Sequence, residues 1–191
     1  HPIADLPSLL GPGDVLVVND AGTLPASIAG TFVGAPIELR LAGPAEEGWA
    51  VLFGPGDWRQ DTDERPAPPR VRVGDVLLLQ GARVPILEVS DLSPRLVRVA
   101  IDMAHVYAVG QPVQYSYLQR PLRLVDVQTP YAGPPLAVEM PSAGRPLDQG
   151  MRAAIEACGA RLLTLTHAAG LSATGDPALD AALPLPERYS V

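Results

Sequence analysis

The stretch LAVEMPSAGRPLDQGMRAAIEACGARLLTLTH, residues 136–167, decides the fold. Its first and last parts, 136–140 and 160–166, are apolar runs of strand length, and the part between them has a helical period. Gly159 ends the predicted helix, which places five apolar residues on one face: Leu147, Met151, Ala154, Ile155 and Cys158. Strand, helix and strand within about 30 residues predict a βαβ unit of a parallel sheet.

Both strands of this unit end in turns of small and polar residues. The first turn contains Pro141, Ser142, Ala143 and Gly144, and the second runs from His167 to Gly170. Ligands of open α/β sheets bind at the edge where such strands end, so we expect the two turns to face one ligand. The first turn also enters a helix, and its free N–H groups suit an anion.

His167 follows an apolar strand and precedes small residues. The imidazole could therefore serve as a general base or a hydrogen-bond donor near neutral pH. A partly buried histidine bonded to the backbone is an equally well supported interpretation.

An earlier apolar run, Val15 to Asp20, follows the turn Gly-Pro-Gly-Asp at 11–14 and is predicted to be a buried strand. Asn19 and Asp20 lie at its exit, and one helical turn is expected before it at 5–10. From about Gly30 to Val99 the pattern is β throughout, with turns every 8–12 residues, which predicts a small barrel or sandwich. The predicted strands are 27–33, 35–41, 49–53, 70–72, 76–79, 84–89 and 96–101, and the proline-rich stretch 61–69 is predicted to be a solvated loop.

Two carboxylates stand in apolar surroundings. Glu139 lies between Val138 and Met140, and Asp126 opens the segment Asp-Val-Gln-Thr. A buried carboxylate must be paired, hydrated or functional, because burying it alone is costly. The two could flank a substrate, and pairing with Arg123 or Arg145 explains them equally well.

Three tyrosines, Tyr115, Tyr117 and Tyr131, could stack on a base or seal the seam between the barrel and the α/β part. The sequence contains neither the glycine spacing of a dinucleotide or phosphate loop nor the setting of a hydrolase serine. No group of His, Asp and Glu has metal-ligand spacing, so no metal is expected.

All 14 basic residues are arginine, which excludes Schiff-base chemistry on a lysine. A net charge of −7 is not typical of a stand-alone nucleic-acid binder, although a local arginine stripe stays possible. The single Cys158 excludes an internal disulfide. With no apolar run near about 18 residues and no leader pattern, we expect a soluble, cytoplasmic protein without a membrane segment.

Several blocks in series resemble the S-adenosylmethionine:tRNA ribosyltransferase-isomerase family of queuosine biosynthesis. These blocks, in chain order, are Asp5 to Asp20 with Leu24-Pro-Ala26, Val127-Gln-Thr-Pro-Tyr-Ala132, Val138 to Gly144, Thr164 to Gly170 and Leu185-Pro-Glu-Arg-Tyr189. The resemblance covers most of the chain, and the shared order of the blocks is more specific than any one of them.

The resemblance implies an α/β fold with an inserted, Greek-key-like antiparallel β-barrel. The expected division is an α/β main domain at 1–29 and 100–191, incomplete at both ends, and the barrel at 30–99. The family moves the ribosyl part of S-adenosylmethionine onto a 7-aminomethyl-7-deazaguanine base in tRNA, which forms epoxyqueuosine and releases adenine and methionine.

The resemblance also implies which residues form the site. The expected catalytic residues are His167, Asp20 and Glu139, of which the carboxylates suit the sulfonium of S-adenosylmethionine. The expected substrate-binding residues are Asn19, Asp126, Gln128, Thr129, Tyr131, Pro141, Ser142, Ala143, Gly144 and Gly170.

The chain departs from the family pattern at several of these blocks. The family reads Asn-Asp-Thr-Arg-Val-Ile-Pro-Ala-Arg where this chain has Asn19-Asp-Ala-Gly-Thr-Leu-Pro-Ala-Ser27, so two arginines are absent. The family's Pro-Thr-Ala-Gly-Leu-His-Phe-Thr is Pro141-Ser-Ala-Gly-Arg-Pro-Leu-Asp148 here. Because Gly and Ser cannot hold an anion as Arg does, two alternatives stay open. They are a divergent S-adenosylmethionine-using enzyme with another acceptor and a non-catalytic binding module.

Overall fold

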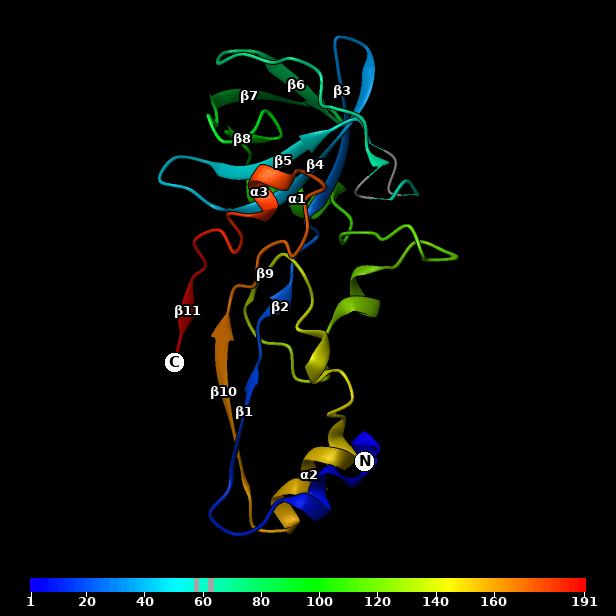
Figure 1. The fold of residues 1–191 in the computed structure, drawn as a ribbon, viewed down its shortest axis with the longest axis vertical. Coiled ribbons are helices and arrows are strands. Elements are labelled where there is room, and N and C mark those ends of the chain that lie inside the picture. Colours follow the sequence, from blue (N-terminus) through cyan, green and yellow to red (C-terminus); the bar gives the residue numbers. More distant parts are fainter. Residues whose placement is uncertain (57–58, 62–63) are drawn as a thin grey trace.

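A computed structural model describes residues 1–56, 59–61 and 64–191. The molecule is elongated, with a β-barrel at one end and a helix, α2, packed on a small sheet at the other (Figure 1). In chain order the elements are η1 (Ile3–Leu9), β1 (Val15–Asn19), β2 (Gly22–Thr23), β3 (Ser27–Phe32), β4 (Ala35–Pro44), β5 (Trp49–Gly54), β6 (Val76–Leu79), β7 (Ala82–Val89), β8 (Leu96–Val99), α1 (Met103–Val109), η3 (Leu124–Val127), β9 (Pro135–Ala137), η4 (Ser142–Gly144), α2 (Gln149–Ala157), β10 (Arg161–His167), α3 (Pro177–Asp180) and β11 (Tyr189–Ser190).

The α2 helix forms where the sequence predicts it. Its N-cap, Asp148, accepts a hydrogen bond from the Met151 amide, and Gly159 follows the helix in the left-handed region at φ 89°. Leu147 and Ile155 are buried in a small core with Val18 of β1. Ala154 is exposed, so the apolar face is narrower than the helical spacing predicts.

The two strands of the predicted βαβ unit do not share one sheet. β10 pairs in parallel with β1 and antiparallel with β11, whereas β9 pairs in parallel with β2. β9 is also shorter than expected, at three residues. The strand ends at Ala137 because the next amide, that of Val138, donates instead to the Ala169 carbonyl oxygen at 2.8 Å.

The β-rich section forms a closed six-stranded barrel in the order β3-β4-β5-β8-β7-β6. All of its strand pairs are antiparallel, and β6 returns after a long connection to lie beside β3, which is a Greek-key arrangement. The predicted α/β fold with an inserted antiparallel barrel is therefore confirmed. The exact division into two domains at residues 30 and 99 stays a prediction.

Alternating side chains fill the barrel interior, as expected for a small barrel. The most deeply buried of these residues are Ile28, Leu39, Leu41, Val51, Phe53, Leu77, Leu79, Ile86 and Val99. The chain enters and leaves the barrel at one point, where Ser27 and Gln111 exchange two backbone hydrogen bonds of 2.8 Å. This bridge anchors the barrel to the α/β part.

One sequence-based expectation in the β-rich section is wrong, because no strand forms at 70–72. The proline-rich stretch 61–69, of which residues 62 and 63 lie outside the described part, contains exposed residues at Glu64, Pro66 and Ala67, as expected for a solvated loop. Arg65 is the exception: its side chain is only 10% exposed and pairs with Glu38. No described helix has both the length and the apolar character needed to cross a bilayer.

Barrel closure depends on a glycine. β3 and β6 are joined through a single registered pair, Thr31 with Leu78. A β-carbon on the neighbouring Gly30 would lie 2.5 Å from both the Leu78 carbonyl oxygen and the Leu79 side chain, so the strands could not approach as closely.

We predict that Gly30→Ala lowers the free energy of unfolding by about 1–3 kcal/mol, the usual cost of overpacking a core. Urea denaturation measures the change. Gly11→Ala is the matched control, because a β-carbon at Gly11 has no neighbour within 4 Å. Equal stability of the two variants would contradict this account of the closure.

Candidate functional site

Residues 19–24 form hydrogen bonds, through their backbone and side chains, to the segments that carry the predicted site residues. The Asn19 side chain donates to the His167 carbonyl oxygen (2.9 Å) and accepts from the His167 amide (2.9 Å), which fixes the end of β1 to the end of β10. The Asp20 carboxylate accepts a hydrogen bond from the Thr166 hydroxyl (2.7 Å). The backbone carbonyl oxygen of Asp20 accepts one from the Gly133 amide (2.6 Å).

The next residues of this backbone hold the segment 127–137. Both ends of the Gln128 amide are used on Thr23: its oxygen accepts from the Thr23 amide (2.9 Å) and its nitrogen donates to the Thr23 carbonyl (3.0 Å). The Thr23 hydroxyl donates to the Val127 carbonyl, and the Leu24 amide donates to Ala137. Gln128 is therefore a structural link between the two segments.

Predicted site residues from three segments line one cavity of about 450 Å³. We call it the Tyr131 cavity. Its walls are mainly apolar, and Asn19 and Ser142 contribute polar groups. The predicted residues that line it are Asn19, Tyr131, Pro141, Ser142, Ala143 and Gly144.

Two hydroxyls near Gly144 have no hydrogen-bond partner among the described residues. The oxygens of Tyr131 and Thr129 are both buried and unpaired. Native proteins pair nearly all such groups, and exceptions call for an explanation such as a ligand or water. A β-carbon on Gly144 would overlap the Tyr131 hydroxyl, so the glycine is required for the tyrosine to lie against this turn. The Arg152 guanidinium lies over the Tyr131 ring, 5.6 Å from its centroid.

A second cavity, of about 340 Å³, adjoins the first and shares Met140 and Ser142 with it. We call it the Glu139 cavity. Tyr115 and Tyr117 line it and stack on each other, with ring centroids 5.4 Å apart and planes inclined by 16°. The remaining lining residues include Thr23, Val113, Leu122, Val127, Val138 and Arg145.

In the described part of the chain, Glu139 accepts hydrogen bonds and forms no ion pair with an arginine. Its carboxylate accepts from the Ser172 hydroxyl at 2.9 Å. Burial, reinforced by the negative charge of Glu139, raises the pKa of Tyr115 to about 12. The Tyr115 phenol is thus protonated at neutral pH and can act as a hydrogen-bond donor.

His167 and Gly170 meet at a different carboxylate. The His167 Nε2 atom lies 2.7 Å from one oxygen of Glu187, and the Gly170 amide donates to the other oxygen at 2.7 Å. Neither His167 nor Gly170 is among the described residues that line the two cavities. Sequence reasoning did not single out Glu187, although it lies in the Leu-Pro-Glu-Arg-Tyr block at 185–189.

Asp126 pairs with Arg123, which is one of the two interpretations that the sequence left open. Its carboxylate accepts three hydrogen bonds from Arg123, and the Arg145 guanidinium donates to its carbonyl oxygen. The hydrogen bond from the Arg123 side chain is the main reason that the pKa of Asp126 falls to about 2. In the described part of the chain, no group of three or more His, Cys, Asp or Glu residues could hold a metal ion.

A family model described as "Queuosine biosynthesis protein" matches residues 1–181. The chain belongs to this family. An S-adenosylmethionine:tRNA ribosyltransferase-isomerase of Thermus thermophilus is 32% identical over 150 residues, which are 74% of this chain and 41% of that protein. One of Anaeromyxobacter dehalogenans is 32% identical over 204 residues, 98% of this chain and 55% of that protein. A solved S-adenosylmethionine tRNA ribosyltransferase from Thermotoga maritima has a TM-score of 0.33 at 18% identity, over 87% of this chain and 44% of that one.

The chain thus spans about half the length of the curated relatives that it matches, and the resemblance read from the ordered blocks is confirmed. The family assignment concerns the chain as a whole. The role of each site residue stays a prediction.

The raised pKa of Tyr115 predicts a loss of stability at alkaline pH. A folded-state pKa above the unfolded value of about 10 means that the folded protein binds the proton more tightly, so stability falls as pH rises from about 10 towards 12. Chemical denaturation between pH 9 and 11.5 should give a steeper decline for the native protein than for Tyr115→Phe. Parallel declines would show that Tyr115 ionises normally.

Proposed function

We propose that the protein transfers and isomerises the ribosyl part of S-adenosylmethionine onto a 7-aminomethyl-7-deazaguanine base in tRNA, forming epoxyqueuosine. Family membership and the names of the curated relatives support this reaction. S-adenosylmethionine is then a substrate, and tRNA is the second substrate. The cytoplasm, where tRNA is modified, stays the expected location.

The observation that carries the proposal is the pair of adjoining cavities separated by Met140 and Ser142. Group transfer between two substrates requires that donor and acceptor be held side by side. The volumes, about 340 and 450 Å³, lie in the range of small-molecule sites. We assign S-adenosylmethionine to the Tyr131 cavity and the acceptor base to the Glu139 cavity.

The groups in each cavity suit these ligands. The unpaired hydroxyl of Tyr131, which lines the Tyr131 cavity, could meet a polar atom of S-adenosylmethionine. In the Glu139 cavity, the stacked tyrosines offer an aromatic face to a flat base, and the Glu139 carboxylate can accept from its N–H groups. Burial raises the pKa of the Tyr131 phenol, and the charge of Asp20 adds a smaller contribution, so the Asp20 carboxylate is close enough to supply negative charge for a sulfonium.

A non-catalytic binding module is the second candidate. The observations that favour it are the absence of both family arginines, replaced by Gly22 and Ser27, and the engagement of the His167 ring with Glu187. A divergent enzyme with another acceptor is compatible with the same observations. The three candidates differ in whether the protein releases adenine and in which acceptor it uses.

Calorimetry with S-adenosylmethionine on the full-length protein, followed by an assay for adenine release with the modified-base tRNA, tests the proposal. Binding together with tRNA-dependent adenine release is the expected result. Binding without release supports the module, and release with a different acceptor supports the divergent enzyme. Absence of both binding and release overturns the enzymatic interpretation.

Tyr131→Phe separates binding from folding. The variant removes a buried hydroxyl that has no partner in the protein, so we predict an unchanged or slightly higher free energy of unfolding, by up to about 1 kcal/mol. If the hydroxyl binds S-adenosylmethionine, affinity should fall by roughly tenfold, which is about 1.4 kcal/mol. Calorimetry and urea denaturation measure the two effects.

Gln128→Ala is the contrasting control. It removes two hydrogen bonds to the Thr23 backbone and should lower the free energy of unfolding by about 1–3 kcal/mol. Its effect on affinity should follow only from that loss of structure. A Tyr131→Phe protein that binds S-adenosylmethionine as tightly as the native chain would remove the ligand from this cavity.

A further inference from the structure

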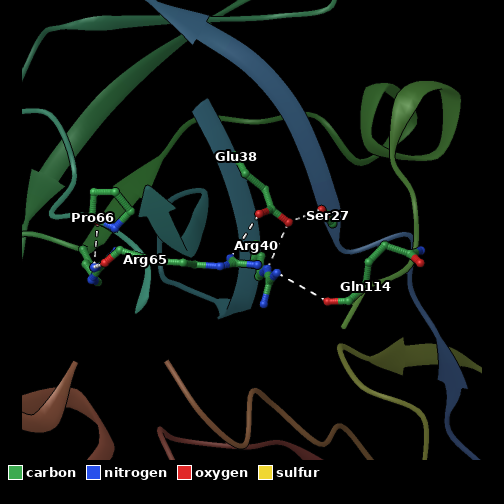
Figure 2. A network of polar contacts seen from close by, with 7 residues as sticks. Ser27, Glu38, Arg40, Arg65, Pro66 and Gln114 are labelled. Carbon is green, nitrogen blue, oxygen red and sulfur yellow. Dashed lines mark hydrogen bonds and ion pairs between the residues drawn. The ribbon is translucent and has the colours of Figure 1, made fainter. Parts of the chain in front are cut away.

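A second polar centre lies in the barrel, and Arg40 connects it to the segment beside the Glu139 cavity by donating to the Gln114 carbonyl oxygen at 3.4 Å. Figure 2 shows the Glu38 carboxylate of β4 between the guanidinium groups of Arg40 and Arg65. One of its oxygens accepts hydrogen bonds from Ser27 (2.6 Å) and Arg40 (3.0 Å), and the other accepts one from Arg65 (3.1 Å). Arg95 joins the group by donating to the carbonyl oxygens of residues 65 and 66, at 2.8 and 2.9 Å.

This centre is buried and rich in positive charge. Glu38, Arg40 and Arg95 are each at most 8% exposed. A further carboxylate near the centre is that of Asp176, whose pKa is lowered mainly by a hydrogen bond from Ser93 and to a smaller degree by the charge of Arg95. Among the described residues, three guanidinium groups therefore face two carboxylates, and none of the three forms an ion pair with Asp176.

An excess of buried positive charge is costly unless an anion compensates it. Two observations indicate that compensation within the described protein is incomplete. The Nε atom of Arg65 is buried without a hydrogen-bond acceptor. Burial and the charges of Arg40 and Arg95 also lower the pKa of Arg65, against the opposing effect of Glu38.

The arginines surround a small hollow. Its volume is about 20 Å³, and its walls include the three arginines together with Glu38, Phe53 and Thr174. A space of this size holds about one water-sized group. It can admit an oxygen of an oxyanion but not a whole nucleotide.

We propose that Arg40, Arg65 and Arg95 form an oxyanion-binding site, which takes a carboxylate or phosphate group whose remaining atoms lie outside the hollow. The planar guanidinium fork matches the spacing of oxygens in both groups. Glu38 orients Arg40 and Arg65 and limits the net charge, so that the site is stable when empty. Binding of an oxyanion here does not require the ribosyl-transfer reaction proposed above.

Thermal unfolding in increasing sodium phosphate, at constant ionic strength adjusted with sodium chloride, tests the site. A ligand that binds only the folded state raises the Tm, and above the dissociation constant the stabilisation grows with the logarithm of the ligand concentration. We expect such a rise for the native protein, and a dissociation constant at least tenfold weaker for Arg65→Gln. Arg83→Gln, which removes an exposed arginine of β7, is the matched control and should retain the native response.

Removing the charge of Glu38 should strengthen phosphate binding, whereas removing that of Arg65 should weaken it. Glu38→Gln removes the internal counter-ion, so the variant should be less stable without phosphate and should gain more from phosphate than the native protein. Repeating the titration with sodium acetate distinguishes the sources: a response to both salts indicates a general oxyanion site, and a response to phosphate alone indicates a phosphate site. An equal Tm rise in Arg65→Gln and the native protein, or no difference between phosphate and chloride, would overturn the proposal.

Discussion

The backbone from Asn19 to Leu24 is the constraint on which the rest of the structure depends. It continues β1 towards the barrel, and its polar groups are hydrogen-bonded to β10 on one side and to the segment 127–137 on the other. The same chain then enters the barrel at Ser27, where the bridge to Gln111 closes the insertion. One short segment therefore sets the positions of the site-bearing turns and of the barrel, and side chains such as Gln128 and Asn19 are used for that purpose.

Sequence patterns predicted the parts of the fold that local chemistry determines. The α2 helix has a capping aspartate, an apolar face and a terminal glycine, and the barrel strands have turns at regular spacing, so their positions could be inferred. The pairing of β9 with β2 could not, because it depends on long-range hydrogen bonds that no local period records. The buried Arg65 was missed for a similar reason: a proline-rich, charged stretch looks solvated until its partner, Glu38, is known.

The candidate site was predicted in outline and not in its details. The turn at 141–144 and Tyr131 do come together with Asn19 around one cavity, as polar residues that follow strands often do. The structure was needed to show that Gln128 links two backbone segments and that His167 contacts Glu187. The sequence does not record whether a polar side chain binds the backbone, another side chain or a ligand. The two unpaired hydroxyls are likewise visible only in three dimensions.

The arrangement around Glu38 bears on the missing family arginines. Ser27 stands where the family pattern has its second arginine, and the register of β3 and β4 places Arg40 directly opposite Ser27. Both side chains donate to the same oxygen of Glu38. A guanidinium group thus reaches this carboxylate from the neighbouring strand, so the loss of arginine at residue 27 does not leave Glu38 without a positive partner.

The central claim is that the segments 129–132 and 141–144 bind one ligand between them. Hydrogen exchange of the full-length protein with and without S-adenosylmethionine, followed by mass spectrometry of peptides, tests it most directly. The account predicts that saturating ligand slows exchange in both segments together, with little change in the barrel strands. Slowed exchange in only one of the two segments, or in the barrel alone, would contradict it.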